Sequence, residues 1–192
     1  MIVPVILAAG ASTRMGRAKA ALDFGGRTAL DLVLDACAGL GEPIVVLGAS
    51  TGVQVARGRV VVNPDWARGQ TSSLKAGLRA SSGDFLLFPV DFALVTADDV
   101  RAIASASGRI VIPSRDMRRG HPVRFDASLR DEFLALDDNS PARAVVQKHE
   151  REIVHVTAVS PYVLMDIDTP EEYAEALKAW SERTKNKDQR PE

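Results

Sequence analysis

A short loop with two fixed positive charges follows the first apolar segment of the sequence. Val3–Ala8 is an apolar run that predicts a buried strand, and this run stops just before Gly10. Small residues follow as far as Gly16, and Arg14 and Lys19 stand five positions apart. Small residues leave backbone N–H groups open to a ligand, and the two cations neutralise phosphate oxygens. The loop therefore predicts a nucleoside triphosphate site at the carboxyl end of the first strand.

The loop differs from the two best-known phosphate-binding patterns. The Walker pattern has four residues between its glycines and then Lys with Ser or Thr, whereas five residues separate Gly10 from Gly16 and Arg17 follows. The dinucleotide pattern G-x-G-x-x-G needs glycines where this chain has Ser12 and Met15. The remaining alternative is an ordinary strand-to-helix turn, which leaves the two spaced cations unexplained.

Acidic residues stand at the ends of two later apolar segments. Phe85–Pro89 predicts a buried strand, and Asp91 stands two residues after it. An acid in that place needs a compensating partner, and Mg²⁺ commonly binds one or two carboxylates together with phosphate oxygens and water. Asp166 and Asp168 alternate, so we expect both on one face of a strand. The alternatives are that Asp91 caps a turn and that Asp168 assists Thr169 at a helix N-terminus.

Strands and helices alternate along most of the chain, which predicts the elements that must position these residues. The apolar residues between Leu30 and Leu40 repeat at helical spacing, and further helices are expected at Thr71–Ala80, at Thr96–Ala104 and from Thr169 onward. Strands are expected at Val3–Ala8, Pro43–Leu47, Arg59–Val62, Phe85–Pro89, Arg109–Ile112, Pro122–Phe125, Ile153–Val156 and Val163–Ile167.

This alternation predicts an α/β fold with three layers, in which helices cover both faces of the sheet (α/β/α). The sheet is expected to be mostly parallel, with antiparallel additions near the C-terminal half at Pro122–Phe125 and Ile153–Val156. Ligands of such sheets bind beyond the carboxyl ends of the strands, where the loop and Asp91 are both expected. We expect one domain over residues 1–180 and a polar, disordered tail over residues 181–192.

Composition excludes several classes of protein. The chain has 192 residues, of which 24 are Lys or Arg and 25 are Asp or Glu, and this balance gives no basic footprint for nucleic acid. No apolar run approaches the roughly 20 residues that cross a bilayer, and no signal peptide is evident. The single cysteine, Cys37, excludes an internal disulfide. We therefore expect a cytoplasmic protein that binds neither nucleic acid nor membrane.

The stretch from residue 7 to residue 19 resembles the signature loop of the molybdenum cofactor nucleotidylyltransferases, the family with a MobA-like NTP transferase domain. It reads Leu7-Ala8-Ala9-Gly10-x-Ser12-x-Arg14-Met15-Gly16-x-x-Lys19. In that family the loop wraps the triphosphate of CTP or GTP, which implies that Arg14 and Lys19 act on the phosphates. The Ala8-Ala9-Gly10 start is more similar to the cytidylyl branch than to the guanylyl branch, where a second glycine is usual.

The resemblance also implies roles for residues outside the loop. Asp91 and Asp168 would be the two metal carboxylates, and the Ser at position 73 would meet the nucleobase. His121, in a Gly-His-Pro segment, and Arg143 would contact the acceptor. For Ser73 the alternative is a helix cap, and for His121 it is a side chain fixed in a tight turn. The chain departs from the family after Asp91, where Phe92-Ala93 replaces Gln-Pro or His-Pro.

The resemblance implies a Rossmann-like nucleotidyltransferase fold, a single NTP transferase domain over residues 1–180 and an Mg²⁺-dependent nucleotidylyltransferase activity. The leading interpretation is transfer of CMP from CTP to the phosphate of molybdopterin, with Arg14, Lys19 and Asp91 as catalytic residues and a molybdoenzyme as the receiver of the product. One alternative is transfer to a sugar or alcohol phosphate. Another is a carrier or maturation partner that binds a nucleotide or cofactor without turnover.

Overall fold

The computed structural model describes residues 1–10, 12–48 and 52–188 of the chain. Its centre is an eight-stranded sheet in the order β3-β2-β1-β4-β7-β5-β6, with β8 paired to β5. The strands are β1 Val3–Ala8, β2 Ile44–Gly48, β3 Arg59–Asn63, β4 Phe85–Pro89, β5 Ile110–Arg115, β6 Arg118–Arg119, β7 Val123–Phe125 and β8 Ile153–Thr157. The α-helices are α1 Ala29–Ala36, α2 Gln70–Ala80, α3 Ala97–Ser105, α4 Arg130–Leu134, α5 Arg143–Lys148 and α6 Pro170–Asp188.

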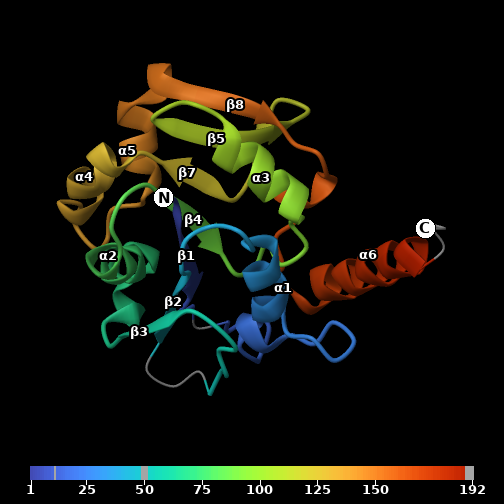
Figure 1. The fold of residues 1–192 in the computed structure, drawn as a ribbon. Helices are drawn as coiled ribbons and strands as arrows, with labels where there is room; N and C mark the ends of the chain where they lie inside the picture. The colour runs from blue at the N-terminus through green and yellow to red at the C-terminus, as the bar shows by residue number, and fades with distance from the viewer. Residues whose placement is uncertain (11, 49–51, 189–192) are drawn as a thin grey trace.

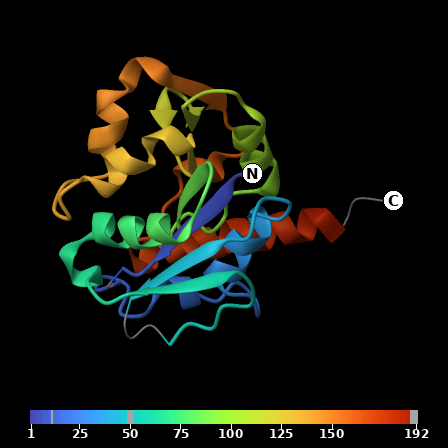
Figure 2. The ribbon, with the colours of Figure 1, turned by 60° about the vertical axis from the view of Figure 1, so that its left-hand side comes forward.

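Helices cover both faces of the sheet, so the predicted three-layer α/β/α fold is confirmed (Figures 1 and 2). Successive side chains of a strand point to opposite faces, and β1 therefore divides its apolar residues between two cores. Ile6 and Ala8 pack with α1, α3 and α6, whereas Val5 and Leu7 pack with α2, α4 and α5. Strands β1 to β4 are mutually parallel, and β7 is antiparallel to both β4 and β5, as predicted for Pro122–Phe125.

Two predictions for the C-terminal half are wrong. Ile153–Thr157 forms a strand, but it pairs parallel to β5 rather than antiparallel. Val163–Ile167 is not a strand, because Pro161 begins a 3₁₀ turn over Pro161–Leu164 and the Ser160 hydroxyl accepts a hydrogen bond from the N–H of Tyr162. The apolar residues of this segment instead pack into the core beside α6. Asp166 and Asp168 therefore follow a turn and do not share the face of a strand.

The C-terminal helix extends beyond the boundary expected at residue 180. Helix α6 runs from Pro170 to Asp188 and leaves the body of the protein towards the C-terminus (Figure 1). Residues 189–192 of the expected tail lie outside the described residues. No described helix combines the length and the apolarity that a bilayer crossing requires.

A buried acid joins helix α3 to the segment that leads to Asp168. The carboxylate of Asp99 accepts a hydrogen bond from the Thr96 hydroxyl at 2.6 Å, which completes a capping box. It also accepts from the backbone N–H groups of Val159 and Ser160 at 2.8 and 3.0 Å, and from the Ser160 hydroxyl at 2.5 Å. Asp99 therefore holds the loop after β8 against the start of α3.

Replacing Asp99 with alanine should lower the free energy of unfolding by about 3 kcal/mol, because three donors of the 159–160 loop, two of them buried, lose their acceptor along with the cap. Asp31 is the matched control, since it makes the same capping box with Thr28 at the start of α1. Asp31→Ala should cost only about 1 kcal/mol. Denaturant unfolding measures both, and equal losses would contradict the role assigned to the loop contacts.

Candidate functional site

The loop after β1 turns on two residues with left-handed backbone. Ser12 has φ 51° and Gly16 has φ 68°, a conformation that glycine adopts without steric cost. The carbonyl of Ser12 accepts from the N–H groups of Met15 and Gly16 at 3.1 and 3.0 Å, and its hydroxyl accepts from the N–H of Lys19 at 3.2 Å. Ser12 thus closes the turn that presents Arg14, and it fixes the backbone at Lys19.

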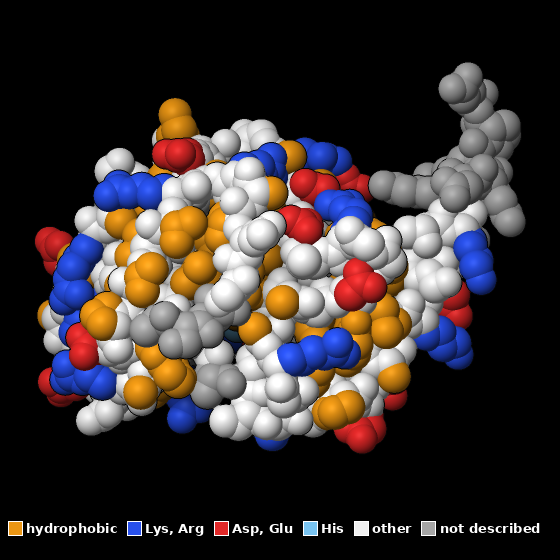
Figure 3. Space-filling view, turned by 90° about the horizontal axis from the view of Figure 1, so that it is seen from below, with side chains coloured by type: hydrophobic (Ala, Val, Ile, Leu, Met, Phe, Trp, Pro, Cys, Tyr) orange, Lys and Arg blue, Asp and Glu red, His pale blue; other side chains and the backbone are white. Residues whose placement is uncertain are grey.

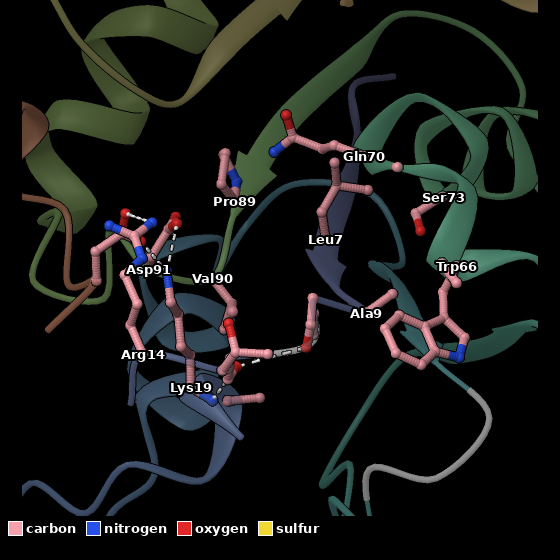
Figure 4. A pocket seen from close by; sticks show the side chains of 18 residues that line it. Leu7, Ala9, Arg14, Lys19, Trp66, Gln70, Ser73, Pro89, Val90 and Asp91 are labelled. Carbon is pink, nitrogen blue, oxygen red and sulfur yellow. Dashed lines mark hydrogen bonds and ion pairs between the residues drawn. The ribbon is translucent and has the colours of Figure 1, made fainter. Parts of the chain in front are cut away.

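The cations of this loop meet the two predicted metal carboxylates (Figure 4). The ammonium of Lys19 contacts the Asp91 carboxylate, with 3.2 Å between Nζ and Oδ2, and it also pairs with Asp168. The guanidinium of Arg14 donates to Asp168 at 2.6 Å. Residues separated by up to 154 positions in sequence are therefore brought together at the carboxyl edge of the sheet.

Burial and charge shift the pKa values of these groups in different directions. Burial raises the pKa of Asp91, and the neighbouring Lys19 offsets this only in part. The hydrogen bond from Lys19 lowers the pKa of Asp168, with Arg14 adding to the effect. Burial alone would lower the pKa of Lys19, but its bonds and charge contacts with Asp168 and Asp91 outweigh burial and raise it. The ammonium form of Lys19 thus counterbalances two carboxylates.

These groups open into a cavity of about 370 Å³. Ten of the residues predicted from the sequence line it: Leu7, Ala8, Ala9, Gly10, Ser12, Arg14, Lys19, Ser73, Asp91 and Asp168. Gly16, His121 and Arg143 do not line it. Gly16 instead shapes the turn, and Arg143 is exposed on α5. The cavity therefore unites the predicted metal residues and, apart from Gly16, the predicted nucleotide residues, but not the predicted acceptor residues.

The wall opposite the charged cluster comes from the segment that joins β3 to α2 and from the start of α2. Trp66, Gln70 and Ser73 lie there, across the cavity from Asp91 (Figure 4). Trp66 packs against the core on the α2 side as well, so it anchors this segment and also forms cavity surface. A Cβ atom on Gly48 would lie 3.1 Å from Cγ of Trp66, so a small residue there lets the indole approach β2.

His121 lies in a buried aromatic contact behind the site. Its ring centroid is 4.7 Å from that of Phe92, the residue after Asp91, and its backbone N–H donates to the carbonyl of Val163 at 2.9 Å. Within the part of the chain that the structure describes, its buried Nδ1 has no hydrogen-bond partner. Burial lowers the pKa of His121 to about 4, although the charge of Asp166 opposes this effect.

The free energy of unfolding should fall on acidification from about pH 6.5 to pH 4 because of His121. The unfolded chain binds a proton with the ordinary pKa of 6.5, whereas the folded protein resists protonation until about pH 4. Protons therefore favour unfolding in this window, by up to about 3 kcal/mol. Urea unfolding across the window should show this slope in wild type and in His155→Gln, an exposed histidine. An unchanged slope in His121→Asn would contradict the assignment.

Asp91 and Asp168 have the donor chemistry of a divalent cation site. Oδ1 of Asp91 is buried and has no hydrogen-bond partner among the described residues, so one ligand atom is available. The described residues contain no cluster of three or more His, Cys, Asp or Glu side chains that could hold a metal. Two carboxylates suit Mg²⁺ when phosphate oxygens and water complete its shell. The residues present therefore fit a metal that arrives with a phosphorylated ligand.

The face seen from below Figure 1 carries scattered positive and negative side chains among hydrophobic and uncharged ones, with no broad area of one sign (Figure 3). Figure 1 places the loop after β1 at this lower end of the sheet. The charged side chains that line the cavity are Arg14, Lys19, Asp91 and Asp168.

Comparisons with known proteins agree with this geometry. The chain is 37% identical to a nicotine blue oxidoreductase of Paenarthrobacter nicotinovorans over 151 residues. The match covers 67% of this chain and 72% of that protein. It is 24% identical to a molybdenum cofactor cytidylyltransferase of Escherichia coli (strain K12), over 93% of this chain and 96% of that protein.

A solved nucleotidyl transferase from Methanothermobacter thermautotroptrophicus superimposes with a TM-score of 0.83 and 26% identity, over 95% of this chain and 99% of that one. The family model for the MobA-like NTP transferase domain matches residues 4–153, which include the loop after β1, Ser73 and Asp91. The chain therefore belongs to the MobA-like NTP transferase domain family.

Proposed function

We propose that this nucleotidyltransferase-family protein transfers CMP from CTP to the phosphate of a molybdopterin-type acceptor. The observation that carries the proposal is the cavity in which Arg14 and Lys19 of the loop meet Asp91 and Asp168. The similarity to a molybdenum cofactor cytidylyltransferase over nearly the whole chain supports the choice of acceptor. We assign the activity to residues 1–180 and place it in the cytoplasm.

In the proposed reaction an oxygen of the acceptor phosphate attacks the α-phosphorus of CTP. The bond from that phosphorus to its bridging oxygen breaks, and pyrophosphate leaves. The acceptor phosphate is already ionised, so no general base is needed. Arg14 and Lys19 would neutralise the charge that develops on pyrophosphate, while the loop fixes the position of the triphosphate.

Asp91 and Asp168 would hold Mg²⁺ in this reaction. When bound, the ion would neutralise phosphate charge that otherwise repels the acceptor. Lys19 must then exchange its contacts with the two carboxylates for contacts with phosphate oxygens. Ser73, across the cavity, would meet the nucleobase.

The acceptor would approach from the side of Asp91. His121 and Arg143 remain the proposed acceptor contacts, and a molybdoenzyme remains the proposed receiver of the product. His121 lies behind Phe92 and outside the cavity lining, so an acceptor must extend past Phe92 to reach it. Phe92, which replaces the residue usual in the family, adds a flat apolar surface beside a carboxylate. Such a surface suits a planar heterocycle.

Pyrophosphate release measures the proposed activity directly. The purified protein should release pyrophosphate when it is given CTP, Mg²⁺ and molybdopterin, and release should be slower with GTP, ATP or UTP. Omitting molybdopterin should abolish release, which separates transfer from hydrolysis of the nucleotide. Absence of release with CTP and molybdopterin would overturn the proposal.

The relative named as an oxidoreductase favours a second candidate function. That relative is 37% identical, and its name, nicotine blue oxidoreductase, describes an oxidation or reduction of nicotine blue. The loop that lines the same cavity suits the pyrophosphate of a reduced nicotinamide dinucleotide. Phe92, next to Asp91 in the chain, offers an aromatic face on which a planar acceptor could stack. We therefore propose reduction of a heteroaromatic compound at the expense of NADH or NADPH as the alternative.

Absorbance at the reduced nicotinamide band distinguishes the two candidates. Consumption of NADH or NADPH in the presence of nicotine blue, without pyrophosphate release from any nucleoside triphosphate, would favour the oxidoreductase. Pyrophosphate release with CTP and molybdopterin, without nicotinamide oxidation, would favour the transferase.

A further inference from the structure

A buried asparagine at the end of β3 has a side chain whose orientation is fixed by its neighbours. Asn63 is only 4% exposed. Its Oδ1 accepts a hydrogen bond from the backbone N–H of Asp65 at 3.0 Å. A backbone N–H can only donate, so the oxygen of the amide must face Asp65 and the NH₂ group must face the other way. The amide of Asn63 therefore points both of its hydrogens towards α2.

Those two hydrogens bind two successive serines. Nδ2 of Asn63 donates to Oγ of Ser72 at 2.9 Å and to Oγ of Ser73 at 3.0 Å. Both hydroxyl oxygens are thus acceptors towards Asn63, and each hydroxyl hydrogen must find an acceptor elsewhere. The asparagine therefore dictates the direction in which both serines donate.

The two serines differ in where their hydrogen can go. Ser72 has backbone carbonyls within reach, that of Gly69 at 2.8 Å and that of Asp65 at 3.0 Å. Over the described residues, the Ser73 hydroxyl has no such acceptor in the protein, and Ser73 lines the cavity whereas Ser72 does not. In Figure 4 the hydroxyl of Ser73 lies between Trp66 and Leu7, towards the space they enclose. The hydroxyl hydrogen of Ser73 is therefore available for a hydrogen bond to a ligand.

We propose that Asn63 is a positioning residue that makes Ser73 a hydrogen-bond donor to the nucleobase. This inference rests on the proposed function, because it takes the cavity to be a nucleotide site. A donating Ser73 hydroxyl selects bases that place a carbonyl oxygen or an unprotonated ring nitrogen opposite it. A base with only an amino group at that point leaves a buried O–H without an acceptor, which typically reduces affinity by about 10-fold.

Replacing Asn63 with aspartate tests the inference with little change of shape. A carboxylate at position 63 still accepts from the N–H of Asp65, but it also accepts from both serine hydroxyls. The hydrogen of Ser73 then turns towards position 63 and no longer faces the base. Dissociation constants should be measured for CTP, GTP, UTP, ATP and inorganic triphosphate, which has no base.

For the nucleotide that wild type binds most tightly, Asn63→Asp should weaken binding by at least about 10-fold relative to inorganic triphosphate. Ser72→Ala is the matched control, since it removes the neighbouring hydroxyl and leaves Ser73 and Asn63 in contact. We define the affinity ratio as the affinity for that nucleotide divided by the affinity for inorganic triphosphate. The control should keep the wild-type ratio. Ser73→Ala should lower the ratio as Asn63→Asp does, and it serves as the test variant if a thermal melt shows that Asn63→Asp does not fold.

Two failures can be told apart. If wild type binds no nucleotide more tightly than inorganic triphosphate, the proposed nucleotide site is wrong. If wild type prefers a nucleotide and neither Asn63→Asp nor Ser73→Ala changes the ratio, the nucleotide site stands and the role of Asn63 is overturned. A fall in the ratio for Ser72→Ala as large as that for Asn63→Asp would also overturn it, because the effect would then be structural.

Discussion

Replacing Asp91 with asparagine should reduce pyrophosphate release by at least about 100-fold, the scale on which removal of a preorganised charge slows catalysis. The amide keeps the shape of the side chain but cannot supply the negative charge that a divalent cation requires. Stability should not suffer, because burial already disfavours the charged form of Asp91 and raises its pKa. The expected variant is therefore folded and nearly inactive.

A matched control separates this effect from a general loss of charge. Asp98 lies on α3 with its side chain 61% exposed and paired only to Arg101 among the described residues, so Asp98→Asn removes one carboxylate far from the cavity. Turnover should stay within about twofold of wild type in Asp98→Asn, as is usual for an exposed pair worth less than 1 kcal/mol. Full turnover in Asp91→Asn would contradict the catalytic role and favour a carrier that binds without transfer.

The sequence predicts the nucleotide half of the protein well because its signals there are local. The uninterrupted apolar runs of β1 and β4 require burial on both faces, which only a covered parallel sheet provides. Because β1 and β4 are parallel, the polar groups that follow each strand lie at the same edge of the sheet. Arg14, Lys19 and Asp91 could be brought to one site by this reasoning, although their contacts could not be known.

Other features depend on pairings that no local pattern encodes. Strand β8 pairs parallel to β5, and this choice is made by tertiary packing across more than 40 residues. The apolar stretch around Val163 has strand-like composition, yet it follows Pro161 and packs as a turn. Asn63 carries no motif, and its importance comes from its contacts with the backbone N–H of Asp65 and with two serine hydroxyls, which only the fold brings together.

Lys19 should affect metal binding as well as phosphate binding, because it lies between the two carboxylates. With side chains 17% and 24% exposed, Lys19 and Asp91 form a pair that is shielded from solvent, and Lys19 also pairs with Asp168. In this form the ammonium holds the place where a cation would meet both carboxylates. A divalent ion must displace it, and a triphosphate offers Lys19 new partners. Metal and nucleotide should therefore bind together better than either does alone.

Replacing Lys19 with methionine should change two measurements in opposite directions. Pyrophosphate release should fall by at least about 100-fold, since the leaving group loses a preorganised charge. Binding of Mn²⁺ to the nucleotide-free protein, followed by electron paramagnetic resonance, should become at least about 10-fold tighter, because a pair near the surface contributes up to about 4 kcal/mol of attraction. Lys75→Met removes a similarly shielded lysine, paired with Asp138 away from the cavity, and should leave Mn²⁺ binding unchanged. Weaker Mn²⁺ binding in Lys19→Met would mean that Lys19 supports the carboxylates rather than competing for them.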